Sequence, residues 1–466
     1  MNRYKKLFSD TVILGLGTFG SKLLVFLLMP LYTAYLSTSQ YGTAELITST
    51  ANLLIPLACV GITNGIFRFA AEHGSDKQAV FSSSVALLGM GTAVFLLLSP
   101  LFTLIDFFTG YTWLIACYVI SANLQAVCAQ YVRAIDKTRL FAWQGILNTS
   151  LTILFNVLFL VLFNMGVTGY VLSVVIGNLL TTAFLVMTAK LWTVFHFRRI
   201  QKRVMWELLL FSLPLIPTTV CWLITDLSDR YMVTYFCGEA ANGVYSAAYK
   251  IPTIVNLISA IFMQAWQFSA VAQSSDEESC KGFYSEVFRG FLSVIVIGAS
   301  GLILFSRFLT GLLLNSAYFE AWQYMPTLLC ATALEAIVSF LATVYMVRKK
   351  SLHSFFTAMI GTILNVILNL LLIPRMGALG AAVATLASYA AVLVARMIDA
   401  PRLIRFKLCL PRLSVSIVCL LGSAAVMTFV SHRRLLWTTA LTACAVAVNL
   451  PTLLRSLRNL LRNHFK

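Results

Sequence analysis

Residues 353–373 read HSFFTAMIGTILNVILNLLLI, and after the short break PRMG at 374–377 the chain continues as ALGAAVATLASYAAVLVAR over 378–396. Each apolar run is about 20 residues long, the length that carries a helix through a hydrocarbon core about 30 Å thick. Inside such a core only helices and closed barrels satisfy every backbone hydrogen bond, and barrel strands are about half as long. The stretch therefore predicts two membrane-spanning helices joined by a tight turn.

Runs of this kind recur along all 466 residues. The composition is 59% hydrophobic and 11% charged, whereas a soluble protein has about a quarter of its residues charged. We therefore expect an all-α polytopic membrane protein with about fourteen transmembrane helices. Polar and turn-forming breaks place these spans at 10–34, 43–67, 80–100, 112–133, 141–163, 167–190, 207–235, 244–271, 283–307, 323–346, 353–373, 378–396, 413–430 and 435–453.

The basic residues predict how the chain is oriented. With a cytoplasmic N-terminus, most of the 34 Lys and Arg residues fall on the inner side, and only Arg307, Arg375, Arg433 and Arg434 fall outside. This bias predicts a multi-pass protein of the bacterial cytoplasmic membrane with both termini cytoplasmic. The Lys and Arg residues behind the net charge of +17 lie between apolar runs. Nucleic-acid-binding proteins instead cluster them on one soluble surface, so no nucleic acid is expected as a partner. The basic amphipathic tail predicts contact with anionic membrane lipids.

Two segments of the chain resemble each other. The motif M-G-x-x-G occurs at 165–169 and again at 376–380, each time between two expected spans. We interpret this as two six-helix lobes related as parallel repeats about an axis along the membrane normal. The expected division is an N-terminal lobe over 1–203, a C-terminal lobe over 204–400, and two extra transmembrane helices with the basic tail over 401–466.

Charged residues inside spans are the candidates for function, because each costs at least about 2.5–3.5 kcal/mol to insert. Asp226, Asp229 and Arg230 share one face of the span at 207–235. One interpretation is a local Asp226–Arg230 salt bridge, which leaves Asp229 to pair with Lys250 of the next span. The other is a functional site in which the carboxylates couple transport to a cation.

Three further charges lie within or at the ends of spans. Lys22 is expected near mid-depth of the first span, about 18 Å along it. Glu335 lies near the middle of its span without a local counterion, where burial favours its neutral form, so we expect a coupling role or a structural hydrogen bond. Arg68 is expected at the inner end of the second span, as an anchor or a substrate contact. Glu45, at the outer end of that span, is expected to be solvated.

Prolines indicate where spans bend. Pro214, Pro217 and Pro252 remove backbone hydrogen bonds inside two spans, so those helices should kink beside the charged face. The ten Cys residues show no metal-ligand or redox spacing. No metal, no cofactor and no catalytic constellation are expected, so the sequence does not predict an enzyme.

Several motifs resemble the polysaccharide transporter family, which includes the Wzx-type flippases, over essentially the whole chain. The longest is the stretch from Asn365 to Thr385. The others are Met29-Pro-Leu-Tyr32 followed by Tyr41-Gly42, Gly65-Ile-Phe-Arg68-Phe, Asp229-Arg-Tyr-Met232, Gly243-Val-Tyr-Ser-Ala-Ala-Tyr-Lys250 and Gln264-Ala-Trp266.

The resemblance implies a two-lobe fold shared with multidrug and toxic compound extrusion transporters, and an undecaprenyl-diphosphate-linked oligosaccharide as cargo. It implies substrate-contacting cations at Lys22, Arg68, Arg230 and Lys250, with ion coupling expected at Asp226, Asp229 and Glu335. A glycan polymerase and glycosyltransferases are the expected protein partners.

The expected function is therefore export of a lipid-linked saccharide for cell-surface polysaccharide biosynthesis, by alternating access. The extra pair of spans departs from the usual twelve and looks more like the lipid II flippases of the same superfamily. A cation-coupled multidrug antiporter on the same fold stays open, because the four intramembrane acids balance the cations. A membrane enzyme would be expected to carry a sizeable outer loop, and the outer connections here are short.

Overall fold

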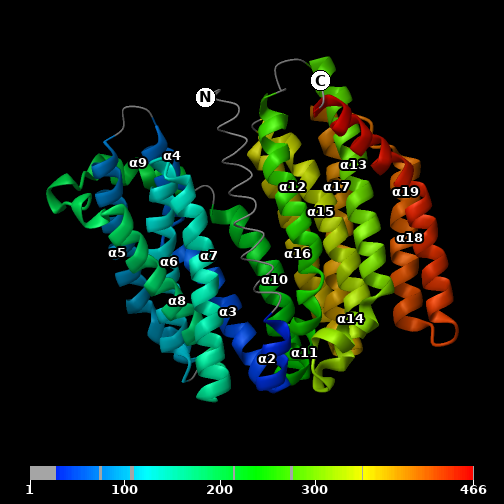
Figure 1. The fold of residues 1–466 in the computed structure, drawn as a ribbon, viewed down its shortest axis with the longest axis horizontal. Coiled ribbons are helices and arrows are strands. Elements are labelled where there is room, and N and C mark those ends of the chain that lie inside the picture. Colours follow the sequence, from blue (N-terminus) through cyan, green and yellow to red (C-terminus); the bar gives the residue numbers. More distant parts are fainter. Residues whose placement is uncertain are drawn as a thin grey trace. The chain divides into compact units, whose positions relative to one another are not determined.

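The computed structural model describes residues 28–72, 76–104, 110–213, 216–272, 277–348 and 350–464. Within these ranges the chain forms helices and short connections without a strand. Among these described residues, ten helices are long and apolar enough to cross a membrane, or eleven if Glu239–Lys250 and Thr253–Met263, bent by 43°, form one span. The chain is thus a multi-pass α-helical membrane protein (Figure 1).

The expected count of fourteen spans is not confirmed. The first expected span lies largely outside the described residues, and three others, at 43–67, 207–235 and 244–271, occur as broken helices that are not among the ten. The span at 43–67 divides into α3 (Thr38–Ala58) and α4 (Ile62–Ala71), because Val60 and Gly61 both have positive φ angles, of 51° and 67°. The span at 207–235 divides into α9 (Lys202–Ser212) and α10 (Ile216–Cys237).

The first compact unit comprises Met1–Leu227. Ser37 and Gln40 form a capping box that starts α3, and Asp76 caps the next long helix. The remaining elements are α2 (Met29–Tyr35), α5 (Lys77–Leu98), η1 (Ser99–Leu104), α6 (Thr112–Ala134), α7 (Thr138–Asn156), η3 (Val157–Leu162), α8 (Gly166–Ala189), η4 (Leu191–Thr193) and η5 (Phe197–Arg199).

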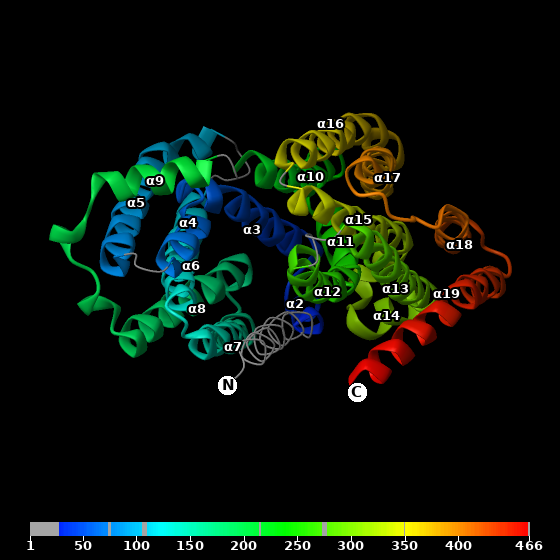
Figure 2. The same ribbon diagram turned by 90° about the horizontal axis from the view of Figure 1, so that it is seen from above.

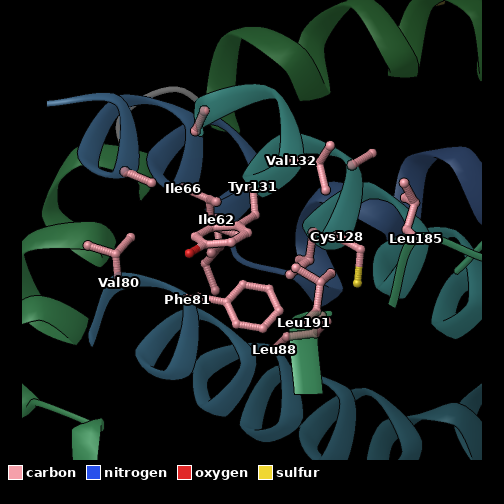
Figure 3. Packing of buried hydrophobic residues seen from close by; sticks show 14 of the residues in the cluster. Ile62, Ile66, Val80, Phe81, Leu88, Cys128, Tyr131, Val132, Leu185 and Leu191 are labelled. Atoms are coloured by element: carbon pink, nitrogen blue, oxygen red, sulfur yellow. The ribbon is translucent and has the colours of Figure 1, made fainter. Parts of the chain in front are cut away.

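A hydrophobic cluster holds one end of this unit together (Figure 3). Ile62 and Ile66, one turn apart on α4, face Phe81 of α5 and Tyr131 of α6. The rings of Phe81 and Tyr131 have their centroids 4.5 Å apart. The i, i+4 spacing on α4 therefore produces the apolar stripe that fixes this short helix against its neighbours.

The second compact unit comprises Ser228–Lys466, and α10 runs across the boundary. At its centre α15 packs against α12, α13, α16, α17 and α18 (Figure 2). The elements after α10 are α11 (Glu239–Lys250), α12 (Thr253–Ala272), α13 (Glu277–Leu304), α14 (Ser306–Leu313), η7 (Ser316–Gln323), α15 (Met325–Val347), α16 (Ser351–Met376), α17 (Ala378–Leu403), α18 (Leu410–Phe429) and α19 (Arg434–His464).

The two units use similar internal packing. In the first, α6 and α7 both pack against α8; in the second, α15 and α16 both pack against α17. The last pair, α18 and α19, packs against α13 within the second unit. The compact units meet at Leu227 and Ser228. The expected division into lobes at residues 203 and 400 stays a prediction. The kink expected at Pro252 is confirmed by the 43° bend between α11 and α12.

Candidate functional site

A buried carboxylate, Asp229 of α10, forms the densest polar network in the described part of the second unit. Its side chain is only 2% exposed. Oδ2 accepts hydrogen bonds from the Tyr245 hydroxyl of α11 at 2.8 Å and the Thr385 hydroxyl of α17 at 2.5 Å. Oδ1 accepts from the amides of Asn369 at 2.6 Å and Asn365 at 3.2 Å, both on α16. Four helices therefore meet at this one side chain.

The helical repeat explains how α16 supplies two donors. Asn365 and Asn369 are one turn apart, so both side chains leave the same face. The Asn369 amide also donates to Asn365 Oδ1 at 3.0 Å, and the Ser228 hydroxyl donates to that same oxygen at 2.8 Å. Asn369 Oδ1 is buried and has no hydrogen-bond partner among the described residues. The network thus holds one unsatisfied oxygen acceptor beside a carboxylate.

Glycine residues allow α16 and α17 to approach closely enough to build this network. A Cβ atom on Gly380 would lie 2.6 Å from the backbone carbon and oxygen of Leu372. At the turn between the helices Gly377 has a φ angle of 61°, which favours glycine. The second M-G-x-x-G motif therefore sets the geometry of the α16–α17 turn, near which Asn369 and Thr385 lie in sequence.

The partners of Asp229 differ from the pairing considered from the sequence. Among the residues that the structure describes, all its hydrogen-bond donors are neutral, and Lys250 is not one of them. Four neutral donors thus satisfy the oxygens of this buried carboxylate without a neighbouring cation. The side chain of Asp226 lies outside the described part of the chain.

The predicted cations Arg230 and Lys250 lie on the same pair of helices as Asp229. Arg230 is half-buried, with its guanidinium carbon 6.0 Å from the centre of the Tyr249 ring. Lys250, also half-buried, is the last residue of α11, directly before the bend at Pro252. Successive residues of α10 thus contact successive turns of α11, with Asp229 at Tyr245 and Arg230 at Tyr249.

Glu335 and Arg68 lie elsewhere. Glu335 of α15 is half-buried, and its Oε2 accepts a hydrogen bond from the Asn256 amide of α12 at 3.1 Å. Arg68 is exposed in the last turn of α4, with its guanidinium carbon 4.7 Å from the centre of the Phe211 ring. Lys22 lies outside the described residues. The roles assigned to these residues stay predictions.

The expectation that Glu45 is solvated is wrong. Its side chain on α3 is 3% exposed, and Oε1 accepts a hydrogen bond from the Tyr170 hydroxyl of α8 at 2.9 Å. The Tyr170 ring lies 4.8 Å from that of Tyr32 and 6.3 Å from that of Tyr41. Tyr41 and Glu45 are one helical turn apart and therefore lie on the same face of α3. This spacing is the sequence feature that could have indicated that Glu45 is buried.

The comparisons with solved structures identify the fold. The chain is similar to a structure described as lipid II flippase MurJ in an inward closed conformation, with 15% sequence identity and a TM-score of 0.74, over 97% of this chain and 100% of that one. An inward-facing multidrug resistance MATE family transporter of the MOP superfamily shares 14% identity with a TM-score of 0.68, over 82% and 96% of the two chains.

A further structure, described as a MOP superfamily transporter from Pyrococcus furiosus whose binding pocket has reversed polarity, shares 14% identity with a TM-score of 0.62, over 84% and 95%. No curated protein matches the sequence. These structural relatives are transporters and flippases rather than enzymes. The profile of one sequence family matches residues 7–267. The chain therefore belongs to the family described as polysaccharide biosynthesis protein, and it has the fold of MOP-superfamily transporters and flippases.

Proposed function

We propose that this protein flips a lipid-diphosphate-linked saccharide across the bacterial cytoplasmic membrane, and that a cation bound at Asp229 drives the transport cycle. The cargo would be an undecaprenyl-diphosphate-linked oligosaccharide used to build a cell-surface polysaccharide. The family supports the pathway, and structural relatives in inward-facing and outward-facing conformations support transport by alternating access. The distribution of Lys and Arg along the sequence supports both termini on the cytoplasmic side.

The observation that carries the proposal is the succession of charges on α10 and α11. Asp229 contacts Tyr245, Arg230 contacts Tyr249 one turn further along, and Lys250 follows Tyr249 directly. A cation bound at Asp229 would alter the Asp229–Tyr245 hydrogen bond, and with it the positions of Arg230 and Lys250. Ion occupancy and anion binding would thereby depend on the same helix pair.

The chemistry of the Asp229 network suits a monovalent cation. Hard cations take oxygen ligands, and this site offers both carboxylate oxygens, the Thr385 hydroxyl and two amide oxygens. Asn369 Oδ1, buried without a donor, is the atom that a cation would satisfy. Sodium would coordinate this oxygen directly, whereas a proton would bind the Asp229 carboxylate. Glu335, half-buried on α15 and accepting a hydrogen bond from the Asn256 amide, is our second candidate for coupling.

The negative charge of the proposed cargo gives the intramembrane Lys and Arg residues a role. A diphosphate cannot enter hydrocarbon without losing its hydration, so a flippase must supply charge-assisted hydrogen bonds along the path. We assign Arg230 and Lys250 of the second unit to this task, together with Lys22 and Arg68 of the first. A ligand shifts an alternating-access equilibrium only when it binds one state more tightly, so these contacts should differ between the two states.

A reconstituted assay tests the proposal. Proteoliposomes would be loaded with a fluorescent undecaprenyl-diphosphate sugar, and flipping measured with and without sodium, proton and voltage gradients. We expect flipping that a sodium or proton gradient accelerates, with no uptake of organic cations. Gradient-driven extrusion of an organic cation without flipping would establish the multidrug antiporter instead. If lipid II were flipped faster than other lipid-linked sugars, lipid II would be the cargo.

A further inference from the structure

Two arginine side chains converge on one tryptophan at one end of the second unit. The guanidinium carbon of Arg307, on α14, lies 5.4 Å from the centre of the Trp322 ring and 5.7 Å from that of Phe319. That of Arg434, the first residue of α19, lies 5.1 Å from the centre of the same Trp322 ring. Elements more than a hundred residues apart in sequence thus bring two positive charges to one aromatic side chain.

These charges have no acidic partner within the described part of the chain. Neither guanidinium group forms an ion pair there, and Glu320, the acidic residue of η7, pairs with neither. Like charges held against the same ring repel each other. Cation–π contacts offset part of that cost, about 0.5–1 kcal/mol each at exposed sites, but they leave the charges themselves unneutralised. An anion is the ligand that this arrangement would bind.

The ends of neighbouring apolar spans indicate that this site lies at the depth of lipid headgroups. Three apolar spans end or begin beside it, at Leu304 before Arg307, at Met325 after Trp322, and at Arg434 itself. Figure 1 shows α14 and the start of α19 at the same end of the second unit. Tryptophan and arginine are both favoured at the membrane–water interface, the former for its amphipathic ring and the latter for its attraction to phosphate.

Exposed apolar side chains lie near both arginines in sequence, on or next to the same two helices. They are between 56% and 65% exposed, and they comprise Phe305, Phe308 and Leu312 around α14, with Leu435 and Leu436 at the start of α19. Cationic groups at interface depth next to an exposed apolar surface match the chemistry of an amphiphile with an anionic headgroup. A soluble anion would leave the apolar part of this surface unused.

We propose that Arg307, Arg434 and Trp322 form a binding site for the phosphate headgroup of an anionic phospholipid. Its acyl chains lie on the exposed apolar side chains of α14 and α19. The lipid neutralises both guanidinium groups and links α14 and η7 to the first turn of α19, which stabilises the attachment of the last two helices to the second unit. This site is separate from the residues to which the cargo and the coupling ion are assigned.

The test measures lipid binding to the full-length purified protein by intact-mass spectrometry, with phosphatidylglycerol and phosphatidylcholine as probes. Each arginine near an anionic headgroup contributes enough to change affinity about fivefold. We expect Arg307→Gln and Arg434→Gln each to weaken phosphatidylglycerol binding by about that factor, and Trp322→Leu to weaken it more than Trp322→Phe. The charge-preserving Arg307→Lys and Arg434→Lys should keep most of the affinity, which separates loss of charge from misfolding.

The matched control is Arg375→Gln, because Arg375 is exposed at the end of α16 and contacts no aromatic ring in the described region. It should leave phosphatidylglycerol affinity unchanged. Equal binding of the two phospholipids, or an equal loss in the Arg375→Gln protein, would overturn the site. Displacement of phosphatidylglycerol by undecaprenyl diphosphate at equimolar concentration would also overturn it and assign the arginines to the cargo lipid, whereas displacement by inorganic phosphate alone would show that no lipid is required.

Discussion

The Nδ2 atom of Asn369 lies 2.6 Å from Oδ1 of Asp229, so α16 and α10 are connected by a short hydrogen bond between two buried side chains. The amide oxygen of the same Asn369 has no donor in the described structure. Hydrogen bonds to a charged group contribute about 1.5–3 kcal/mol each, more than bonds between neutral groups. Asn369 is therefore both a main support of the carboxylate and the side chain best placed to respond when a cation arrives.

Asp229→Asn should abolish the dependence of flipping on an ion gradient. The substitution removes the negative charge that binds the cation, and it leaves one oxygen acceptor where the carboxylate had two. We expect the gradient-driven rate to fall at least tenfold in proteoliposomes. The control is Glu207→Gln, which removes an exposed carboxylate paired with Arg203. Unchanged gradient dependence in the Asp229→Asn protein would exclude Asp229 from coupling.

Gly380→Ala should destabilise the second unit. The added Cβ would lie 2.6 Å from backbone atoms of Leu372, and neither helix can yield without moving Asn369 or Thr385. Overpacking of this kind costs about 1–3 kcal/mol. Gly298→Ala on α13 is the control, because a Cβ there meets no atom within 4 Å. The melting temperature of the Gly380→Ala protein should fall while that of the control stays constant or rises, and equal melting temperatures would contradict the packing argument.

The sequence predicted the regular spans well and the broken ones poorly. The runs at 353–373 and 378–396 became α16 (Ser351–Met376) and α17 (Ala378–Leu403), because a continuous apolar run in a membrane has no stable alternative to a helix. The break between α3 and α4 depends on positive φ angles at Val60 and Gly61. Gly61 permits such an angle but valine rarely adopts one, so the sequence did not predict a break at this position.

The candidate site was predicted in part. Periodicity placed Asp229 and Arg230 on one helix, and it placed Asn365 and Asn369 one turn apart. It could not show that these two pairs meet, since the contact joins residues 140 positions apart. From the sequence alone, nothing distinguishes Asn365 and Asn369 from asparagines that only hold neighbouring helices together. Glu45 was misassigned for the same reason, because its partner Tyr170 lies 125 positions away.

Tyr170→Phe should destabilise the first unit. The substitution removes the hydroxyl that donates to Glu45 at 2.9 Å while keeping the ring that packs on Tyr32. Loss of one donor to a buried carboxylate costs about 1–3 kcal/mol, so the melting temperature should decrease. Glu45→Gln should be milder, since its amide oxygen still accepts from Tyr170. Tyr235→Phe serves as the control because Tyr235 is 83% exposed, and an effect as large as that of Tyr170→Phe would contradict the prediction.

Lys250→Gln should abolish flipping, because we assign Lys250 to the diphosphate of the cargo. Charge-assisted contacts to a phosphate contribute about 1.5–3 kcal/mol each, so cargo binding should weaken about tenfold to a hundredfold while the fold is retained. Lys250→Arg should keep part of the activity. Lys77→Gln, at the exposed start of α5, is the matched control.

The double variant Lys250→Gln with Asp229→Asn distinguishes this role from a purely structural one. If Lys250 only neutralised Asp229, removal of both charges would restore activity. In the structure Asp229 accepts hydrogen bonds from four neutral donors on α11, α16 and α17. Removing the charge of Asp229 should therefore not compensate for the loss of the Lys250 charge. We therefore expect the double variant to be as inactive as either single one, measured as cargo flipping in proteoliposomes at matched protein density. A double variant that flips at the wild-type rate would show that Lys250 does not bind the cargo.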